Sequence, residues 1–256
     1  MGGRRTLNGP LDAVTFLTRI PLRAKRRADT DTGNAVPWFP VVGAAIGLLI
    51  GAVYAGCAVA LPHLLAATIA LAVGLLVTGA LHEDGLGDVA DAFGGGRDQD
   101  DALRIMKDPR LGTFGVLAIV MSVLVRIVGI ASLGGPVALV VLPAVHSLSR
   151  SAAVGAMTIF EPVHGGLGSV YSRSLVRRRV ILGIAGGTLI AAVLVRVWVL
   201  PAVAIGAVVA GVMGALARRK IGGINGDVLG AIEQLTEMAL LVGAVALVHA
   251  HLAVGW

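Results

Sequence analysis

The sequence predicts an all-α, polytopic integral membrane protein with about seven transmembrane helices. Of its 256 residues, 56% are hydrophobic and only 14% are charged, and the mean hydropathy is +0.88. Soluble domains usually carry about 25% charged residues, so this chain has more aliphatic surface than a water-soluble fold can use. Apolar runs of roughly 18 residues or more, which can cross a bilayer as helices, recur along the chain.

Seven apolar stretches are the predicted spans, and short turns or polar blocks separate them. In chain order they cover residues 41–60, 64–81, 111–133, 137–160, 180–200, 201–217 and 238–254. Gly and Ala are frequent in these stretches, as is typical of helices that pack closely in lipid. Pro62 and the Gly-Gly-Pro sequence at 134–136 indicate turns between neighbouring spans. We treat the whole chain, residues 1–256, as one membrane-embedded domain.

The basic residues indicate how the predicted spans are oriented. Eighteen of the 21 Lys and Arg precede the first span or lie in the polar blocks 82–110, 161–179 and 218–237. With seven spans, these four segments fall on the same side of the membrane, which the positive-inside rule predicts to be cytoplasmic. The N-terminus is therefore predicted to be cytoplasmic. Because the net charge of +6 comes from segments beside the spans, we predict no nucleic-acid partner.

The polar block after the second span concentrates acidic residues. Its segment 81–96, LHEDGLGDVADAFGGG, contains Glu83, Asp84, Asp88 and Asp91. If the second span continues as a helix, then Asp84, Asp88 and Asp91 stand at i, i+4 and i+7 and share one face. Three like charges so close together repel one another unless a cation is present. Oxygen ligands without a Cys or His pair favour Mg²⁺ or Mn²⁺ over Zn²⁺. We therefore predict a divalent-metal site, with a solvated acidic loop as the alternative.

Small and basic residues around this cluster suggest room for a phosphorylated substrate. Gly85 and Gly87 predict a point at which a bulky substrate approaches the backbone. The next segment, RIMKDPRLGTFG at 104–115, contains Arg104, Lys107 and Arg110, which suit phosphate binding near a metal. Positive-inside topology explains the same basic residues equally well. Asp108 either extends the metal site or caps the following helix.

A glycine-rich turn in the block RRKIGGINGDVLGAIEQLTE, residues 218–237, is a second candidate for phosphate binding. Asn225 and Asp227 stand among glycines and precede an apolar helix. Such a turn offers backbone N–H groups to a phosphate, whereas the simpler interpretation makes Asp227 a helix N-cap. Arg126 and Arg150 lie within predicted spans, where a charge is costly. We expect both to face the bundle interior, as phosphate ligands or as partners of a carboxylate.

Five linked motifs resemble those of the cobalamin synthase family, and they occur in the expected order over nearly the whole chain. They are FLTRIPL (16–22), WFPVVGAAIG (38–47), HEDGLGDVADAFGGG (82–96), IMKDPRLGTFG (105–115) and KIGGINGDVLGAIEQLTE (220–237). Members of this family are adenosylcobinamide-GDP ribazoletransferases of the bacterial inner membrane. Asn225 stands where the family often has Thr, and Gly87 where Ala is common; neither difference removes a charged group.

The resemblance implies a reaction, its substrates and the roles of the candidate residues. Adenosylcobinamide-GDP reacts with α-ribazole, or its 5′-phosphate, to give adenosylcobalamin, or its 5′-phosphate, and GMP. The reaction implies Mg²⁺ and an active site on the cytoplasmic side of a multi-pass protein. Asp84, Asp88 and Asp91 would be catalytic metal ligands, with Glu83 as an additional ligand. The residues that would bind substrate and phosphate are Lys107, Asp108, Arg110, Arg150, Asn225 and Asp227. The sequence does not distinguish which carboxylate accepts the hydroxyl proton, and a homo-oligomer is compatible with it.

Two other functions stay open on the residues alone. A CDP-alcohol-phosphotransferase-like enzyme acting on a lipid head group would also hold metals with spaced aspartates. Its D-G-x-x-A-R signature is incomplete here, because Gly85 is not followed by the Ala-Arg pair. A cation transporter would also place carboxylates in a membrane protein, but it predicts acids near the middle of the membrane and an inverted repeat, and no clear repeat is visible.

Overall fold

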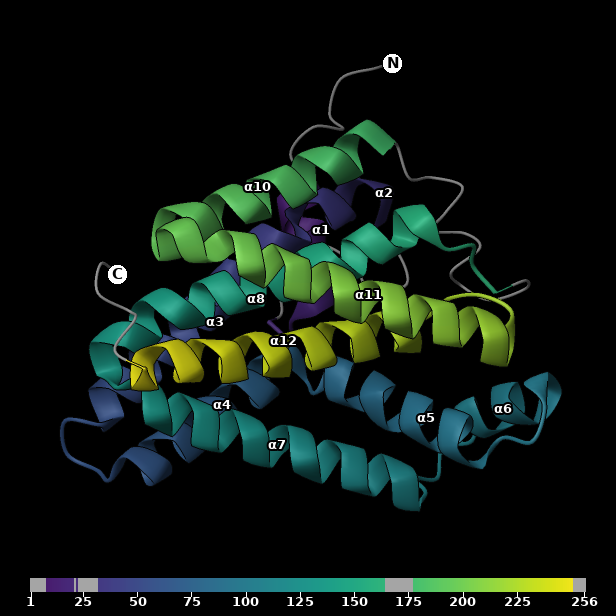
Figure 1. Cartoon of the computed structure of the whole chain (residues 1–256), viewed down its shortest axis with the longest axis horizontal. Coiled ribbons are helices and arrows are strands. Elements are labelled where there is room, and N and C mark those ends of the chain that lie inside the picture. The colour runs from purple at the N-terminus through teal and green to yellow at the C-terminus, as the bar shows by residue number, and fades with distance from the viewer. Residues whose placement is uncertain (1–7, 21, 23–31, 164–176, 251–256) are drawn as a thin grey trace.

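The computed structural model describes residues 8–20, 22, 32–163 and 177–250, and these form a bundle of helices (Figure 1). Within these ranges, the only pairing of β type is one isolated bridge between Pro162 and Ile224. The all-α prediction is therefore confirmed. The elements are α1 (Asn8–Leu17), α2 (Thr32–Ala35), the 3₁₀ turn η2 (Val36–Trp38), α3 (Phe39–Cys57), α4 (His63–Thr78), α5 (Leu81–Gly95), α6 (Gln99–Met106), α7 (Thr113–Leu133), α8 (Gly135–Ile159), α10 (Arg177–Val195), η3 (Arg196–Trp198), α11 (Val199–Ile221) and α12 (Gly226–His249).

The helices agree with a polytopic membrane protein. Among the described residues, five stretches are long and apolar enough to cross a bilayer, and α4 and α5 counted together make a sixth. The longest stretch, Arg177–Ile221, contains both α10 and α11, which η3 separates and which run in opposite directions (Figure 1). The seven predicted spans thus correspond to α3, α4, α7, α8, α10, α11 and α12. The last residues of the final predicted span, 251–254, lie outside the described residues, as do most of the basic residues before the first span.

The second predicted span ends earlier than the sequence suggested. Helix α4 stops at Thr78, and Gly79 and Ala80 adopt left-handed conformations with φ of 65° and 52°. Glycine adopts this conformation without strain, whereas alanine seldom does. The chain turns by 88° here, so α5 is a separate helix and does not continue the second predicted span.

The final span begins earlier than predicted. Helix α12 starts at Gly226, whereas the sequence placed the start of the apolar span near Met238. The reason is that Glu233 and Glu237, which we had assigned to a polar block, are buried inside the bundle with charged partners. Polar residues that are paired in this way do not end a membrane helix.

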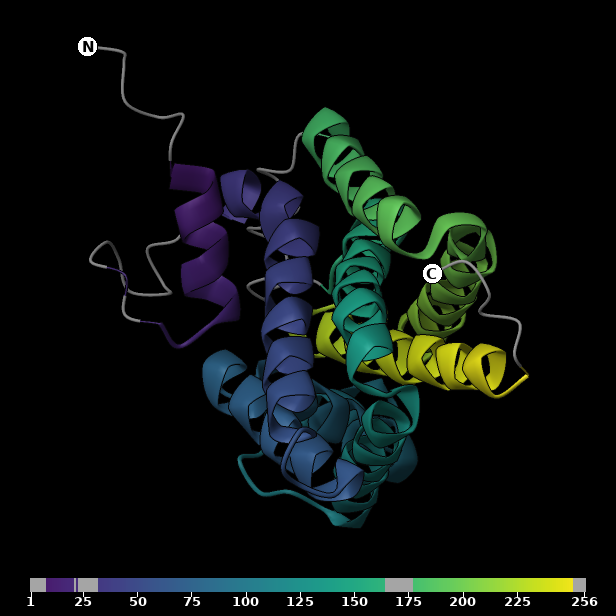
Figure 2. The same ribbon diagram turned by 90° about the vertical axis from the view of Figure 1, so that its left-hand side faces the viewer.

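Helix α8 is the centre of the bundle. It packs against α3, α10, α11 and α12, and Figure 2 shows it between α3 and α11. In the most apolar 18-residue segment of α8, 72% of the residues are buried inside the protein. The corresponding share for the stretch Arg177–Ile221, at the periphery, is 17%. On α3, the glycines at 43, 47 and 51 face α8, and a Cβ at Gly51 would lie 2.9 Å from the carbonyl oxygen of Ala138. This stripe of small residues lets the backbones approach closely, as in other membrane helix pairs.

Candidate active site

Helix α5 presents three aspartates on one face, and α12 adds a fourth carboxylate. Because Leu81–Gly95 is helical, Asp84, Asp88 and Asp91 do stand one above another. The charges of Asp84, Asp91 and Asp227 all act on Asp88, and those of Asp84 and Asp227 act on each other. Two helices far apart in the sequence thus assemble one acidic cluster, Asp84–Asp88–Asp91–Asp227.

Gly85 explains how α12 approaches this face so closely. A Cβ at position 85 would lie 2.8 Å from the carbonyl oxygen and 3.0 Å from the Cα of Asp227. A Cβ at Gly87 would lie 2.9 Å from Ile119 Cδ1 and 3.0 Å from Leu111 Cδ1. These glycines make room for neighbouring helices. Our expectation that they admit a substrate to the backbone is therefore wrong.

Two members of the acidic cluster have no side-chain partner among the residues that the structure describes. Within the described part of the chain, the carboxylates of Asp84 and Asp88 make no hydrogen bond or ion pair; Asp84 is exposed and Asp88 is half-buried. Neighbouring carboxylates without basic partners favour a bound cation. Since the donors are all carboxylate oxygens, they fit Mg²⁺ better than a metal that prefers nitrogen or sulfur.

Asp91 already has partners, although it belongs to the same face. Its two carboxylate oxygens accept hydrogen bonds from the backbone N–H groups of Gly112 and Gly115, at 2.6 and 2.9 Å. These donors belong to the N-terminal turn of α7, where unpaired N–H groups and the helix dipole both favour an anion. Asp91 therefore anchors α7 to α5, and any metal would have to use its remaining lone pairs.

We expect Asp91→Asn to destabilise the protein. An amide supplies one acceptor oxygen and places an NH₂ group against a backbone N–H, so either the Gly112 or the Gly115 N–H loses its acceptor. The cost should be about 1–3 kcal/mol. Thermal unfolding in detergent should show a lower midpoint than wild type. An unchanged midpoint would contradict the anchoring role.

Glu83 points to a different environment from its neighbour Asp84. Arg126 Nη1 donates to Glu83 Oε1 at 2.6 Å, and Gln234 Nε2 donates to the same oxygen at 3.2 Å. This contact is buried. Glu83 was predicted as an additional metal ligand. That role stays a prediction, but this carboxylate already has a guanidinium partner.

Glu83 belongs to a buried ionic network that joins α5, α7, α8 and α12. Its members are His82, Glu83, Ser122, Arg126, His146, Ser149, Arg150, Glu233, Gln234 and Glu237. Arg126 Nε lies 3.3 Å from Glu237 Oε1, and Arg150 forms an ion pair with Glu233. The sequence left open whether Arg126 and Arg150 bind phosphate or pair with a carboxylate. In the structure both arginines pair with carboxylates.

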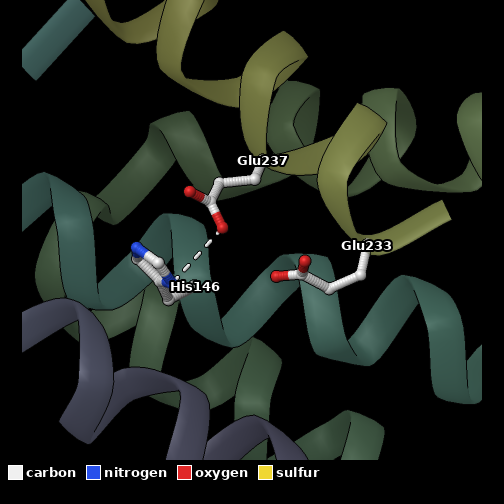
Figure 3. Close-up of side chains that lie close together, drawn as sticks. All are labelled: His146, Glu233 and Glu237. Carbon is white, nitrogen blue, oxygen red and sulfur yellow. Dashed lines mark ion pairs between the residues drawn. The ribbon is translucent and has the colours of Figure 1, made fainter. Parts of the chain in front are cut away.

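Three residues of this network form a candidate metal-binding group. One ligand atom from each of His146, Glu233 and Glu237 lies within 4.8 Å of the others, and His146 Nδ1 is 3.4 Å from Glu237 Oε2 (Figure 3). However, Arg150 pairs with Glu233 and its Nη1 lies 3.8 Å from Glu237. Because Arg126 and Arg150 already supply positive charge here, we interpret the group as part of the ionic network and not as a metal site.

An apolar cavity of about 450 Å³ connects the buried network to the acidic cluster. Five of the residues predicted to act in catalysis or substrate binding line it: Asp84, Lys107, Arg150, Asn225 and Asp227. Asn225 is the N-cap of α12, accepting from Val228 N–H at 3.0 Å, and its Nδ2 donates to Asp227 Oδ2 at 2.9 Å. Asn225, and not Asp227, therefore caps the helix, and it holds the Asp227 carboxylate in place.

Asp108 and Arg110 lie outside this cavity, in the loop between α6 and α7. Arg110 Nε and Nη2 donate to the two carboxylate oxygens of Asp108 at 2.9 and 2.7 Å, and this hydrogen bonding lowers the pKa of Asp108 well below its usual range. Asp108 does not cap the next helix, since Gly112 is the N-cap of α7. Their predicted roles in substrate binding are untested.

The fold and the site define a class of protein: a polytopic membrane protein whose interior holds a cavity with a carboxylate-rich rim. Residues 9–245 match the family model described as cobalamin-5-phosphate synthase, and the chain belongs to this family.

Similar proteins carry one name. The adenosylcobinamide-GDP ribazoletransferase of Rhizobium meliloti (strain 1021) is 38% identical over 258 residues, which cover 92% of this chain and 94% of the relative. Those of a Sinorhizobium species and of Chlorobaculum tepidum are 41% and 37% identical, covering 92% and 91% of this chain and 94% and 93% of the relatives. No solved structure matches the chain.

Proposed function

We propose that this protein joins adenosylcobinamide-GDP to α-ribazole, or to α-ribazole 5′-phosphate, and releases GMP. The product would be adenosylcobalamin or its 5′-phosphate. Membership of the cobalamin-5-phosphate synthase family and the names of the relatives support this reaction. The observation that carries the proposal is the meeting at one cavity of Asp84, Lys107 and Asp227, which come from three separate sequence motifs.

The reaction would exchange one phosphorus–oxygen bond for another. A ribose hydroxyl oxygen of ribazole bonds to the pyrophosphate phosphorus on the cobinamide side, and the bond from that phosphorus to the oxygen of GMP breaks. A carboxylate of the acidic cluster accepts the hydroxyl proton. Lys107 would bind phosphate oxygens at the rim, and Asn225 would keep Asp227 oriented through its 2.9 Å hydrogen bond. The apolar walls would limit the access of water, which would otherwise compete with the hydroxyl.

We infer that Mg²⁺ is the cofactor. Asp84, Asp88 and Asp91 are the proposed ligands, and the charge of Asp227 acts on Asp84 and Asp88 from α12. When bound, the ion would neutralise the pyrophosphate and the charge that develops on the departing GMP.

A purified-protein assay tests both proposals. Protein in detergent, supplied with adenosylcobinamide-GDP and α-ribazole, should release GMP and form the joined corrinoid in equal amounts. Activity should disappear in EDTA and return when Mg²⁺ is added in excess. Full activity in EDTA would refute the metal role. The absence of product with Mg²⁺ and both substrates, from protein that remains folded, would refute the reaction.

We further propose that the protein lies in the bacterial inner membrane with the acidic cluster on the cytoplasmic side. The basic residues support this orientation. Several of them lie in the blocks around α5–α6 and before α12, and the positive-inside rule places such blocks on the cytoplasmic side. In a Cys57→Ala background, a cysteine replacing Val59, which is 86% exposed between α3 and α4, should react with an impermeant thiol reagent on intact cells. A cysteine replacing Asp98 should react only after lysis. The opposite pattern would reverse the orientation.

A further inference from the structure

We propose that the apolar cavity binds the base of α-ribazole, and not the guanine or the corrin ring of the other substrate. This inference rests on the proposed function and deepens it, since it states which part of which substrate enters the interior. The base is a dimethylated benzimidazole. It is planar and aromatic, and its one free polar atom is a ring nitrogen that accepts a hydrogen bond.

The walls of the cavity match such a base in shape and polarity. Side chains from four separate parts of the chain supply apolar surface: Phe16, Phe39, Leu103, Met106, Met157 and Phe160. The rings of Phe16 and Phe39 are stacked, with centroids 5.2 Å apart and planes inclined by 16°. Aromatic rings and methionine sulfur both pack favourably against a planar aromatic ligand. A volume of about 450 Å³ suits one molecule of moderate size.

The other candidate groups fit the cavity poorly. Guanine carries several donors and acceptors around its ring, and the mostly apolar walls would leave some of them without partners, which opposes binding. The corrin ring with its side chains is far larger than this cavity. Dimethylbenzimidazole presents two methyl groups to the walls and requires a single donor.

The two ends of the cavity differ in a way that orients the ligand. The inner end carries Arg150, which is 3% exposed and whose Nε–H has no hydrogen-bond partner within the described residues. Because Arg150 lines the cavity, we expect its guanidinium group to donate to the ring nitrogen while its Nη1 remains paired with Glu233. The outer end carries Asp84 and Asp227. A base seated inside would leave its ribose at this rim, where the acidic cluster lies.

Direct binding of ribazole tests the inference without requiring turnover. Purified protein in detergent is titrated with α-ribazole alone by calorimetry. Free dimethylbenzimidazole should compete with it, and guanosine should not. Competition by guanosine and not by dimethylbenzimidazole would assign the cavity to the nucleotide and overturn the inference.

A cavity-filling variant locates the site. Ala153 of α8 lines the cavity, so Ala153→Leu should weaken α-ribazole binding by about tenfold or more. The affinity for adenosylcobinamide-GDP should stay within about twofold of wild type, a difference of less than half a kcal/mol. The matched control is Ala207→Leu on the exposed face of α11, which should change neither affinity. Weaker binding of adenosylcobinamide-GDP alone would contradict the inference.

A second variant keeps the test decisive if Ala153→Leu does not fold. Leu103→Ala removes apolar wall contributed by α6 and should also weaken α-ribazole selectively. Unchanged α-ribazole affinity in folded Leu103→Ala would count against the site.

Different results would refute the proposed function and the cavity assignment. Ribazole binding with this specificity but no transfer would refute the function alone, whereas normal transfer with unchanged ribazole affinity in folded Ala153→Leu would refute the cavity assignment alone.

Discussion

Replacing Asp88 by Asn should reduce transfer about a thousandfold or more while leaving the protein folded. Asp88 is central to the acidic cluster, since Asp84, Asp91 and Asp227 all act on it, and it has no partner within the described residues. Asparagine keeps the size of the side chain but removes the charge that a cation requires. Because the change also relieves repulsion among carboxylates, the thermal midpoint without metal should be equal to that of wild type or slightly higher.

Asp98→Asn is the matched control. Asp98 is the N-cap of α6, where its Oδ1 accepts from the N–H of Asp101 at 2.9 Å, and it does not line the cavity. Asparagine caps helices about as well as aspartate, so both turnover and stability should be close to wild type. The two variants are compared by turnover on adenosylcobinamide-GDP and by thermal unfolding in detergent. Wild-type turnover in Asp88→Asn, or inactivity that merely follows unfolding, would remove Asp88 from the proposed metal site.

Part of this site could be predicted because its signals are local. The spacing of Asp84, Asp88 and Asp91 specifies one helix face whatever the helix packs against. Basic residues inside apolar runs demand interior partners, which is why Arg126 and Arg150 were expected to face inward. Composition and the lengths of the apolar runs were likewise sufficient for the all-helical membrane fold.

The rest depends on contacts between distant segments, which no local pattern contains. The 88° turn after α4 places residue 80 in a left-handed conformation although it is Ala, a residue that gives no turn signal. Glu233 and Glu237 were placed in a polar block because their partners, Arg126 and Arg150, lie on other helices. Their spacing of four residues, which puts both on one face of α12, was the available signal. The sequence could not predict that Asp227 joins the acidic cluster, because this depends on how closely α12 packs against α5 at Gly85.

The charges of the buried network predict which of its residues the fold tolerates losing. Three carboxylates, Glu83, Glu233 and Glu237, face two guanidinium groups, those of Arg126 and Arg150. When the histidines are neutral and all three carboxylates are ionised, one negative charge is left over. Removing a guanidinium increases this surplus, whereas removing one carboxylate abolishes it.

Arg126→Met should therefore be strongly destabilising and Glu237→Gln should not. Arg126 is 3% exposed and pairs with both Glu83 and Glu237, so its loss leaves two buried carboxylates without that partner. Loss of one partner from a buried ion pair costs about 3–5 kcal/mol, which corresponds to a fall in Tm of roughly 6–20 °C for a chain of this size. Glu237→Gln keeps the shape and removes the surplus charge, so its Tm should lie within about 3 °C of wild type. Thermal unfolding of both variants in one detergent distinguishes them. Equal losses would contradict the charge count, and would indicate that Glu237 is held by more than the two arginines, such as a cation shared with His146 and Glu233.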